Sequence, residues 1–245
     1  MKNYLRLLRP KHYVKNVLVL LPLFFSGRFF ERMPLCVGLL GFAAFCLLSS
    51  LVYIVNDLRD APADRLHPTK CRRPIASGAV GVPSALALAA ALGAAVLLLG
   101  ILARFPAGSW LCMGVYLLVN LGYSFGLKNV PILDVVLLVS GFLLRVLFGA
   151  SVTGITISNW LYLTVVSISF YLALGKRRGE LRRQSDTARP VLRYYNDAFL
   201  SRNMSSCLTL AVVFYSLWSV DEANAGTHLV WTVPLVLCLC LKYSL

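Results

Sequence analysis

Of the 245 residues in the chain, 58% are hydrophobic and only 14% are charged, and the mean hydropathy is +0.74. Soluble globular domains carry about 25% charged residues, so this balance excludes that class and predicts a multi-pass membrane protein. The net charge of +14 does not indicate nucleic-acid binding, because the cations lie between apolar runs rather than in a basic tail or along a helix face.

The apolar segments follow a short basic one. The first 16 residues combine five cations with aliphatic and aromatic side chains, which predicts an amphipathic segment in the membrane interface. Eight apolar segments follow, each long enough or nearly long enough to cross a hydrocarbon core of about 30 Å. The predicted spans are residues 17–30, 35–55, 82–103, 109–125, 132–153, 160–174, 207–220 and 229–241. The sequence therefore predicts an all-α membrane bundle, as a single domain over residues 1–245.

The lysines and arginines are divided unequally between the two sides of this bundle. With the N-terminus in the cytoplasm, 20 of the 24 fall on the cytoplasmic side, three fall on the other side, and Arg145 lies within a span. Cytoplasmic loops of membrane proteins carry such an excess of lysine and arginine. We therefore expect the N-terminus and two long loops, residues 56–81 and 175–206, on the cytoplasmic side of the inner cell membrane.

Three of the ten acidic residues lie together directly after the second predicted span. Asp57, Asp60 and Asp64 are spaced at i, i+3 and i+7, which places them on one face of a helix. Carboxylates are ligands that Mg²⁺ prefers, and bound Mg²⁺ takes further ligands from water and substrate phosphates. Asn56 adds a neutral oxygen. The spacing therefore predicts that these four residues hold a Mg²⁺ ion.

Cations follow the acids in the same segment. Lys70 and Arg73 are expected to bind phosphate oxygens that the metal leaves free. His67 helps to hold a ribose or a phosphate, or alternatively forms the turn before Pro68. The segment thus indicates a magnesium-bridged diphosphate, and the alternative is a solvated charge run after a helix end. No GxGxxG or GxxxxGK[ST] motif occurs, so neither a dinucleotide site nor a P-loop is supported.

These motifs resemble those of a known family. NDxxDxxxD followed by HPTKxxRPIASG is similar to the first aspartate-rich motif of the UbiA superfamily of intramembrane prenyltransferases. Within it, the chain is most similar to the decaprenyl-phosphate phosphoribosyltransferases. The resemblance extends to four further patches, which read RPKHYVKN, YSFGLKNVPILD, SGFLLR and GKRRGEL.

The resemblance implies an architecture and further site residues. Family members have nine helices around a central cavity, in two four-helix halves and a final helix, so the eight predicted spans cover the two halves and the chain is expected to be short at its C-terminus. Because the RPKxxxKN pattern recurs in the family, Lys15 and Asn16 are expected to turn into the site. The other N-terminal cations are interpreted as a membrane anchor.

The second long loop departs from the prenyltransferase pattern. Where family members that use a polyprenyl diphosphate donor have a second aspartate-rich motif, this chain has Lys176, Arg177 and Glu180 among further cations. Ammonium and guanidinium groups bind phosphate without a metal. We therefore expect two anionic substrates, one held through Mg²⁺ and the other by this basic loop; the alternative is a loop whose charges set topology only.

Four polar residues lie where lipid is expected. Tyr123 and Lys128 end the fourth span, Asp134 begins the fifth, and Arg145 lies 11 residues further along it. Eleven residues are about three helical turns, so Asp134 and Arg145 share a face. A charge at this depth is costly unless it faces the bundle interior or a watery cavity, which makes Arg145 a candidate for substrate binding. The alternative is a buried structural partner of Asp134 or of a helix C-terminus.

The resemblance implies a Mg²⁺-dependent transferase that moves a 5-phosphoribosyl group from phosphoribosyl diphosphate to a polyprenyl phosphate such as decaprenyl phosphate, for cell-wall precursor synthesis. The residues themselves indicate a metal-bound diphosphate and a second anion at one face of a membrane bundle. A prenyltransferase that moves a polyprenyl group from its diphosphate to an aromatic or other small acceptor is the first alternative, but it would need a second acidic cluster. A transporter for anions is the second, but it would place charges along a pore on several spans.

Overall fold

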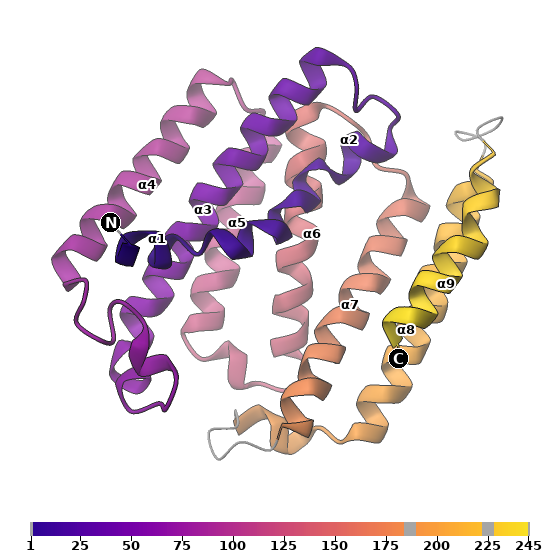
Figure 1. The fold of residues 1–245 in the computed structure, drawn as a ribbon. Coiled ribbons are helices and arrows are strands. Elements are labelled where there is room, and N and C mark those ends of the chain that lie inside the picture. The colour runs from indigo at the N-terminus through magenta and orange to yellow at the C-terminus, as the bar shows by residue number, and fades with distance from the viewer. Residues whose placement is uncertain (1, 184–189, 222–227, 245) are drawn as a thin grey trace. The chain divides into compact units, whose positions relative to one another are not determined.

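The computed structural model describes residues 2–183, 190–221 and 228–244, and this part of the chain is helical without a β-strand (Figure 1). The predicted all-α fold is therefore confirmed. The α-helices are α1 (Lys2–Leu8), α2 (Leu21–Phe25), α3 (Arg32–Arg65), α4 (Val82–Leu102), α5 (Ala107–Ser124), α6 (Leu133–Thr153), α7 (Asn159–Arg182), α8 (Asp197–Ser219) and α9 (Val233–Ser244). The 3₁₀ segments are η1 (Pro10–Leu20), η2 (Lys70–Arg72), η3 (Leu127–Asn129), η4 (Pro190–Tyr194) and η6 (Leu229–Thr232).

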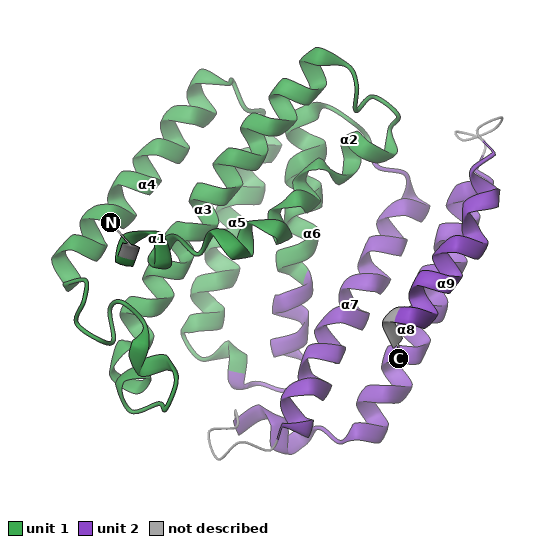
Figure 2. Cartoon of the chain, viewed as in Figure 1, with its two compact units in different colours: residues 1–128, 140–156 green, residues 129–139, 157–245 purple. Residues whose placement is uncertain are grey.

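The chain divides into two compact units (Figure 2). Unit 1 comprises residues 1–128 and 140–156, and unit 2 comprises residues 129–139 and 157–245. The boundary falls within α6, whose first turns belong to unit 2 and whose remainder belongs to unit 1. The single domain expected over residues 1–245 stays a prediction.

Three of the described helices are long and apolar enough to cross a membrane by themselves, namely α3, α4 and α6. The first predicted span, residues 17–30, is not one helix. It contains the end of η1 and the five residues of α2. Pro22 lies in the first turn of α2, and because it has no amide hydrogen it cannot continue the hydrogen-bond pattern of the preceding segment.

The acidic segment was expected to be a loop from residue 56, but it is helical as far as Arg65. Leu58 and Ala61 pack against the apolar side chains of unit 1, so the last turns of α3 have a buried face. The helix α3 ends at Arg65, two residues before His67. His67 precedes Pro68, and helical backbone geometry is disfavoured at the residue before a proline. With 34 residues α3 is roughly 50 Å long, against a hydrocarbon core of about 30 Å. Its acidic end therefore extends beyond a span that begins near residue 32.

The second expected loop, residues 175–206, is also shorter. Its first part forms the last turns of α7, which ends at Arg182, and α8 begins at Asp197. The Asn196 side chain accepts a hydrogen bond from the amide of Phe199 at 2.7 Å, which is the usual way to cap a helix N-terminus. The cations of the GKRRGEL motif are therefore fixed on a helix rather than on a loop.

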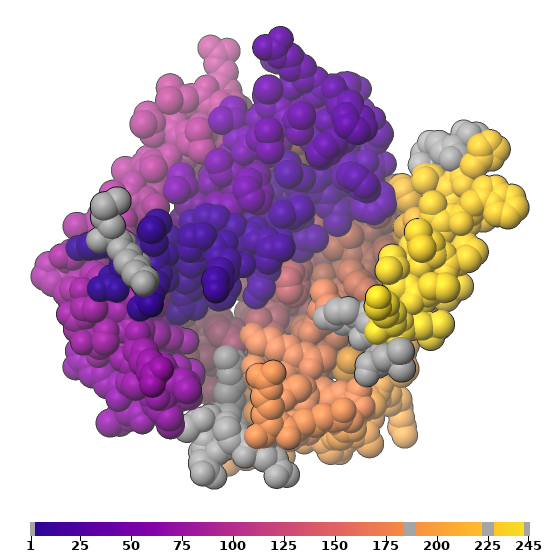
Figure 3. All heavy atoms as spheres, viewed as in Figure 1, coloured from indigo at the N-terminus to yellow at the C-terminus, as the bar shows by residue number. Residues whose placement is uncertain are grey.

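In unit 1 the N-terminal segment lies across α3 (Figures 1 and 3). Phe45 of α3 packs between Tyr116 of α5 and Phe148 of α6, with ring centroids 4.8 and 5.2 Å apart. A Cβ atom at Gly149 would overlap the carbonyl oxygen of Val19, so only glycine lets η1 approach α6 this closely. The segment that carries Arg9, Lys15 and Asn16 is thus held in a fixed position within unit 1.

Candidate anion and metal site

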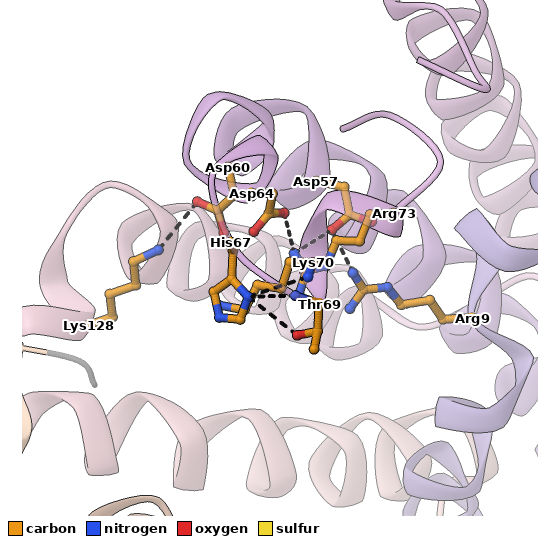
Figure 4. A network of polar contacts seen from close by, with 9 residues as sticks. All are labelled: Arg9, Asp57, Asp60, Asp64, His67, Thr69, Lys70, Arg73 and Lys128. Carbon is orange, nitrogen blue, oxygen red and sulfur yellow. Dashed lines mark hydrogen bonds and ion pairs between the residues drawn. The ribbon is translucent and has the colours of Figure 1, made fainter. Parts of the chain in front are cut away.

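Two of the three predicted carboxylates converge at the end of α3. Asp57 and Asp64 are only 3% and 4% exposed, and Arg73 binds both through one nitrogen, Nη1, at 3.1 Å from Asp57 Oδ1 and 2.6 Å from Asp64 Oδ2 (Figure 4). The helical spacing predicted for them is confirmed. Arg73 was expected to bind phosphate, and in this structure it occupies the position between the two acids.

A second arginine on Asp57 was not among the predicted site residues. Arg9 Nη2 lies 2.6 Å from Asp57 Oδ1, and its guanidinium lies 5.0 Å from the ring centroid of Tyr53 (Figure 4). Arg9 has a left-handed backbone with φ of 53°, which separates α1 from η1. The sequence carried a signal for this residue, because Arg9 opens the RPKHYVKN motif, but its charge was attributed to membrane anchoring.

Asp60 and Asn56 point to other partners. Asp60 accepts a hydrogen bond from Lys128 Nζ at 3.4 Å, on the opposite side of the cluster from Arg9 (Figure 4). The Asn56 side-chain oxygen accepts a hydrogen bond from the Ser124 hydroxyl at the end of α5. Lys128, which was expected at the end of the fourth span, thus contacts the acidic face of α3, and among the described residues Asp60 has a different cation as its partner from Asp57 and Asp64.

The loop after α3 is organised by His67. Its Nδ1 accepts hydrogen bonds from the amides of Thr69 and Lys70, at 3.2 and 3.4 Å, so His67 forms the turn that was one of its two expected roles (Figure 4). The side chain of Lys70 is exposed at the start of η2. Arg65 donates to the carbonyl oxygen of Ala76 at 3.3 Å, which ties the end of α3 to the far end of this loop.

The chemistry of these side chains fits Mg²⁺. Within the described residues, no three histidine, cysteine or acidic side chains already form a metal-binding group. Mg²⁺ needs only one or two carboxylates when water and substrate phosphates complete its shell. Asp57 and Asp64 supply such a pair, already brought together by the positive charge of Arg73. A divalent cation and an arginine are therefore alternative counter-charges for the same two acids.

Two further predicted substrate ligands bind each other in the interior of unit 1. Asn16 and Arg145 are 1% and 5% exposed, and Arg145 Nε donates to Asn16 Oδ1 at 2.8 Å. Arg145 also donates to the Gly141 carbonyl oxygen and, at 3.0 Å, to the Tyr116 hydroxyl. The Asn16 amide nitrogen donates to Ser49 Oγ at 3.0 Å. Arg145 is thus buried among neutral acceptors, and among the described residues Asp134 pairs with Arg177, so the alternative role of Arg145 as a partner of Asp134 is wrong. Its role in substrate binding stays a prediction.

In unit 2 Asp134 has a different arginine as its partner. Arg177, which is fully buried, donates to Asp134 and also to Glu180 Oε2, at 2.7 Å for the latter. The Tyr195 hydroxyl donates to Asp134 Oδ1 at 2.6 Å and accepts from the Ile132 amide at 2.7 Å. Burial and this hydrogen bond to Asp134 raise the pKa of Tyr195 to about 12. The phenol is therefore a permanent donor to Asp134 near neutral pH.

The other cations of α7 lie nearer the surface. Arg178 and Arg182 donate to Asp197 Oδ1 at 3.1 and 2.8 Å, and these hydrogen bonds lower the pKa of Asp197 to about 2. The side chain of Lys176 is exposed, as is that of Lys15 on η1. Tyr123 lies half-buried in the last turn of α5.

The helical fold and these charge clusters define a membrane-embedded bundle whose acids and arginines are suited to anionic substrates. Residues 19–245 match the model of the UbiA prenyltransferase family. The chain belongs to this family of integral membrane proteins.

Known proteins are similar over most of the chain. A decaprenyl-phosphate phosphoribosyltransferase of Corynebacterium glutamicum is 37% identical over 228 residues, which cover 91% of this chain and 69% of that protein. The protein of the same name from Mycolicibacterium smegmatis is 37% identical and covers 90% of this chain and 71% of its own length. Among solved structures, a UbiA homolog from Archaeoglobus fulgidus bound to DMAPP and Mg²⁺ has the same fold, with a TM-score of 0.76 and 19% identity over 98% of this chain and 85% of that chain.

Proposed function

We propose that this protein is a transferase that moves a 5-phosphoribosyl group from phosphoribosyl diphosphate to a polyprenyl phosphate such as decaprenyl phosphate, and releases diphosphate. The names of its relatives at 37% identity support the two substrates. The observation that carries the proposal is the pairing of Asp57 and Asp64 with two arginines at one end of α3. Such a cluster can exchange its internal ion pairs for a metal-bound diphosphate.

The donor is assigned to this cluster. Asp57 and Asp64 would hold Mg²⁺, with Asp60 as a third carboxylate on the same helix and Asn56 beside them. Bound Mg²⁺ supplies a Lewis acid that neutralises charge on a departing diphosphate. With Mg²⁺ bound to the two acids, Arg73 and Arg9 would be able to bind diphosphate oxygens. Lys70 and Lys128 add positive charge at the rim of the same site.

The acceptor is assigned to the basic end of α7. A phosphate monoester is already ionised near neutral pH, so one of its oxygens can form the new bond to the anomeric carbon without a general base. The bond from that carbon to the diphosphate oxygen breaks, and the leaving diphosphate takes the electron pair. Lys176 and its neighbours hold the acceptor phosphate. This accounts for the absence of an acid/base pair among the predicted site residues.

The residues of α7 support the prenyltransferase alternative less well. It requires a second acidic cluster for a second metal, whereas Glu180 on α7 is bound to Arg177 and its neighbours are cations. We place both charge clusters on the cytoplasmic side of the inner membrane, where phosphoribosyl diphosphate is available, on the strength of the charge distribution.

The experiment that tests the proposal is transfer by the purified protein in detergent from labelled phosphoribosyl diphosphate to decaprenyl phosphate, with and without Mg²⁺. We expect a lipid-linked phosphoribosyl product only with Mg²⁺. Asp57→Asn should reduce turnover at least a hundredfold, because the metal supplies several kcal/mol of charge stabilisation. A substitution of the exposed Arg72 by Gln serves as the control for loss of a charge in the same loop. Formation of a prenylated aromatic product, with no phosphoribosyl transfer, would favour the alternative.

A further inference from the structure

The backbone of Arg9 has a conformation that the local sequence disfavours. With φ of 53° and ψ of 56°, Arg9 lies in the left-handed region, where the Cβ atom of a residue other than glycine comes close to the following carbonyl oxygen. Pro10 follows, and a residue before proline favours an extended backbone. Such a strained backbone persists only where the surrounding structure holds it. The contacts around Arg9 should therefore include those that hold its conformation.

Ser50 of α3 provides one of these contacts. It is fully buried, and its hydroxyl donates to the carbonyl oxygen of Leu8 at 2.9 Å. Leu8 is the last residue of α1, and the last carbonyl groups of a helix have no partner within that helix. The Leu8 carbonyl and the Arg9 amide belong to one planar peptide unit, and rotation about the next bond is the angle φ of Arg9. The hydrogen bond from Ser50 therefore restrains this angle directly.

Tyr13 attaches the other side of Arg9 to the same serine. A serine hydroxyl has one hydrogen to donate and can accept two hydrogen bonds. The carbonyl oxygen of Cys46, one turn earlier in α3, also lies 2.9 Å from the Ser50 oxygen, so the hydrogen is shared between this carbonyl and that of Leu8. The Tyr13 hydroxyl, 2.8 Å from the Ser50 oxygen, is therefore the donor of its pair. The chain is thus bound to Ser50 both before and after Arg9.

The same face of α3 receives the side chain of Arg9. Ser50, Tyr53 and Asp57 are spaced at i, i+3 and i+7, so they lie on one face of the helix. The Arg9 guanidinium lies 5.0 Å from the ring centroid of Tyr53, and its Nη2 lies 2.6 Å from Asp57 Oδ1 (Figure 4). A change of φ to extended values would rotate the Arg9 side chain relative to the Leu8 peptide unit and so move the guanidinium relative to both partners.

We propose that Ser50 and Tyr13 are positioning residues that hold Arg9 in its left-handed conformation. They thereby place its guanidinium beside Asp57, where the donor diphosphate is assigned. A binding side chain has to be held close to its productive geometry by the residues around it. This inference rests on the proposed function for the identity of the ligand, and on the geometry alone for the coupling between Ser50 and Arg9.

A double-mutant cycle on the purified full chain in detergent tests this coupling without any substrate. Thermal unfolding is measured for Ser50→Ala, for Arg9→Gln and for the double variant. The double variant should lose clearly less in Tm than the sum of the two single losses, because without the guanidinium there is no Asp57 contact for Ser50 to support. Ser109→Ala is the matched control, since Ser109 is also fully buried and donates to Ser151 at 2.9 Å. Its loss should add to that of Arg9→Gln, and equal additivity for Ser50→Ala would overturn the inference.

Donor kinetics give the second readout. Ser50→Ala should raise the KM for phosphoribosyl diphosphate about fivefold, with a smaller change in kcat, because the backbone of Arg9 is free to leave its disfavoured conformation. In the Arg9→Gln background the same substitution should have no further effect on the KM. Tyr13→Phe keeps the hydrogen bond from Ser50 to Leu8 and should raise the KM less; it serves as the second variant if Ser50→Ala lowers the yield of folded protein. Ser109→Ala should leave the KM unchanged. An unchanged KM in both Ser50→Ala and Tyr13→Phe would overturn the inference.

The proposed function and this inference fail separately. If no phosphoribosyl product forms but the losses of Ser50→Ala and Arg9→Gln are non-additive, the proposed reaction is wrong and the positioning of Arg9 stands. If the product forms with Mg²⁺ and Ser50→Ala behaves as Ser109→Ala does, the reaction stands and Ser50 only fastens the N-terminal segment to α3.

Discussion

At the scale of single residues, the site is built from acids that already have partners. Asp57 and Asp64 are nearly inaccessible to solvent, and removing water from a carboxylate is costly unless a cation accompanies it. Arg9 and Arg73 provide that compensation. Under the proposed function, the same charges would be available to a metal-bound diphosphate, which would replace these ion pairs rather than enter an uncompensated cluster of negative charge.

Arg9 is predicted to contribute to donor binding although it lies outside the residues matched by the family model. Arg9→Gln should raise the KM for phosphoribosyl diphosphate about tenfold, because hydrogen bonds to charged groups contribute about 1.5–3 kcal/mol. Its effect on kcat should be smaller. Lys11→Gln, which removes an exposed cation from the same segment, should leave the KM unchanged. Steady-state kinetics at saturating acceptor separate the two variants. If both variants raise the KM for phosphoribosyl diphosphate equally, Arg9 acts only through its charge and not through a specific contact.

Tyr195 gives unit 2 a pH-dependent stability. The pKa of Tyr195 is about 12, above its ordinary value of 10.0, so the folded state favours the neutral phenol. The resulting stabilisation is complete below pH 10 and is lost as the pH rises toward 12. Tyr195→Phe should lower the free energy of unfolding by about 1–3 kcal/mol at neutral pH, because Asp134 loses a buried donor.

Thermal unfolding in detergent from pH 9 to 12 measures both effects. The unmodified protein should lose stability over this range more steeply than Tyr195→Phe. Tyr194→Phe provides the comparison, since the Tyr194 side chain is exposed and its hydroxyl contacts only the neighbouring Arg193 among the described residues. A parallel decline in all three proteins would contradict the assignment of the effect to Tyr195.

At the scale of elements, the packing of η1 in unit 1 determines where Arg9 lies. Gly149→Ala should push η1 away from α6, because the new methyl group would overlap the Val19 carbonyl oxygen. We expect a loss of stability of about 1–3 kcal/mol and a raised KM for phosphoribosyl diphosphate. Gly114→Ala on α5 meets no atom within 4 Å and should be neutral or slightly stabilising, as alanine favours a helix. If Gly149→Ala is destabilised but its KM for phosphoribosyl diphosphate is unchanged, the packing of η1 does not determine the position of Arg9.

The elements also show how far the sequence could be interpreted. Hydropathy predicted the membrane bundle and most helix positions, because apolar runs of that length have few other structures in a bilayer. It did not predict the helical continuation of α3 or α7, since polar side chains mark the end of a span and not the end of a helix. Lys15 and Asn16 were predicted together as ligands, yet their side chains differ in burial, which depends on the 3₁₀ geometry of η1.

Pairing between distant residues was the least predictable feature of the site. The composition of the acidic segment predicted an anion site, and the structure does place Asp57, Asp64 and Arg73 together. Nothing in the sequence identified Arg9 as the partner of Asp57, because 48 residues separate them. In the same way Asp134 binds Arg177, which lies 43 residues away. Helical periodicity had instead suggested Arg145 as its partner.

At the scale of the whole molecule, the length of α3 and the distribution of charge bear on membrane orientation. The apolar part of α3 begins near residue 32, and its carboxylates lie seven or more turns further along the helix. A membrane that covers the apolar part therefore leaves residue 32 and the acidic end on opposite sides. The positive-inside tendency assigns the acidic end to the cytoplasm, since 20 cations lie on that side of the predicted topology and three on the other.

Cysteine labelling of a variant without native cysteines tests this orientation. Arg28→Cys and Arg104→Cys should react with a membrane-impermeant maleimide in intact cells, because both positions are predicted to face away from the cytoplasm. Arg72→Cys, in the exposed part of the loop after α3, should react only in inverted vesicles or after permeabilisation. Labelling of all three in permeabilised membranes shows that each thiol is reachable. If Arg72→Cys reacts in intact cells, the acids of α3 lie on the side without phosphoribosyl diphosphate, and the proposed reaction would have no donor.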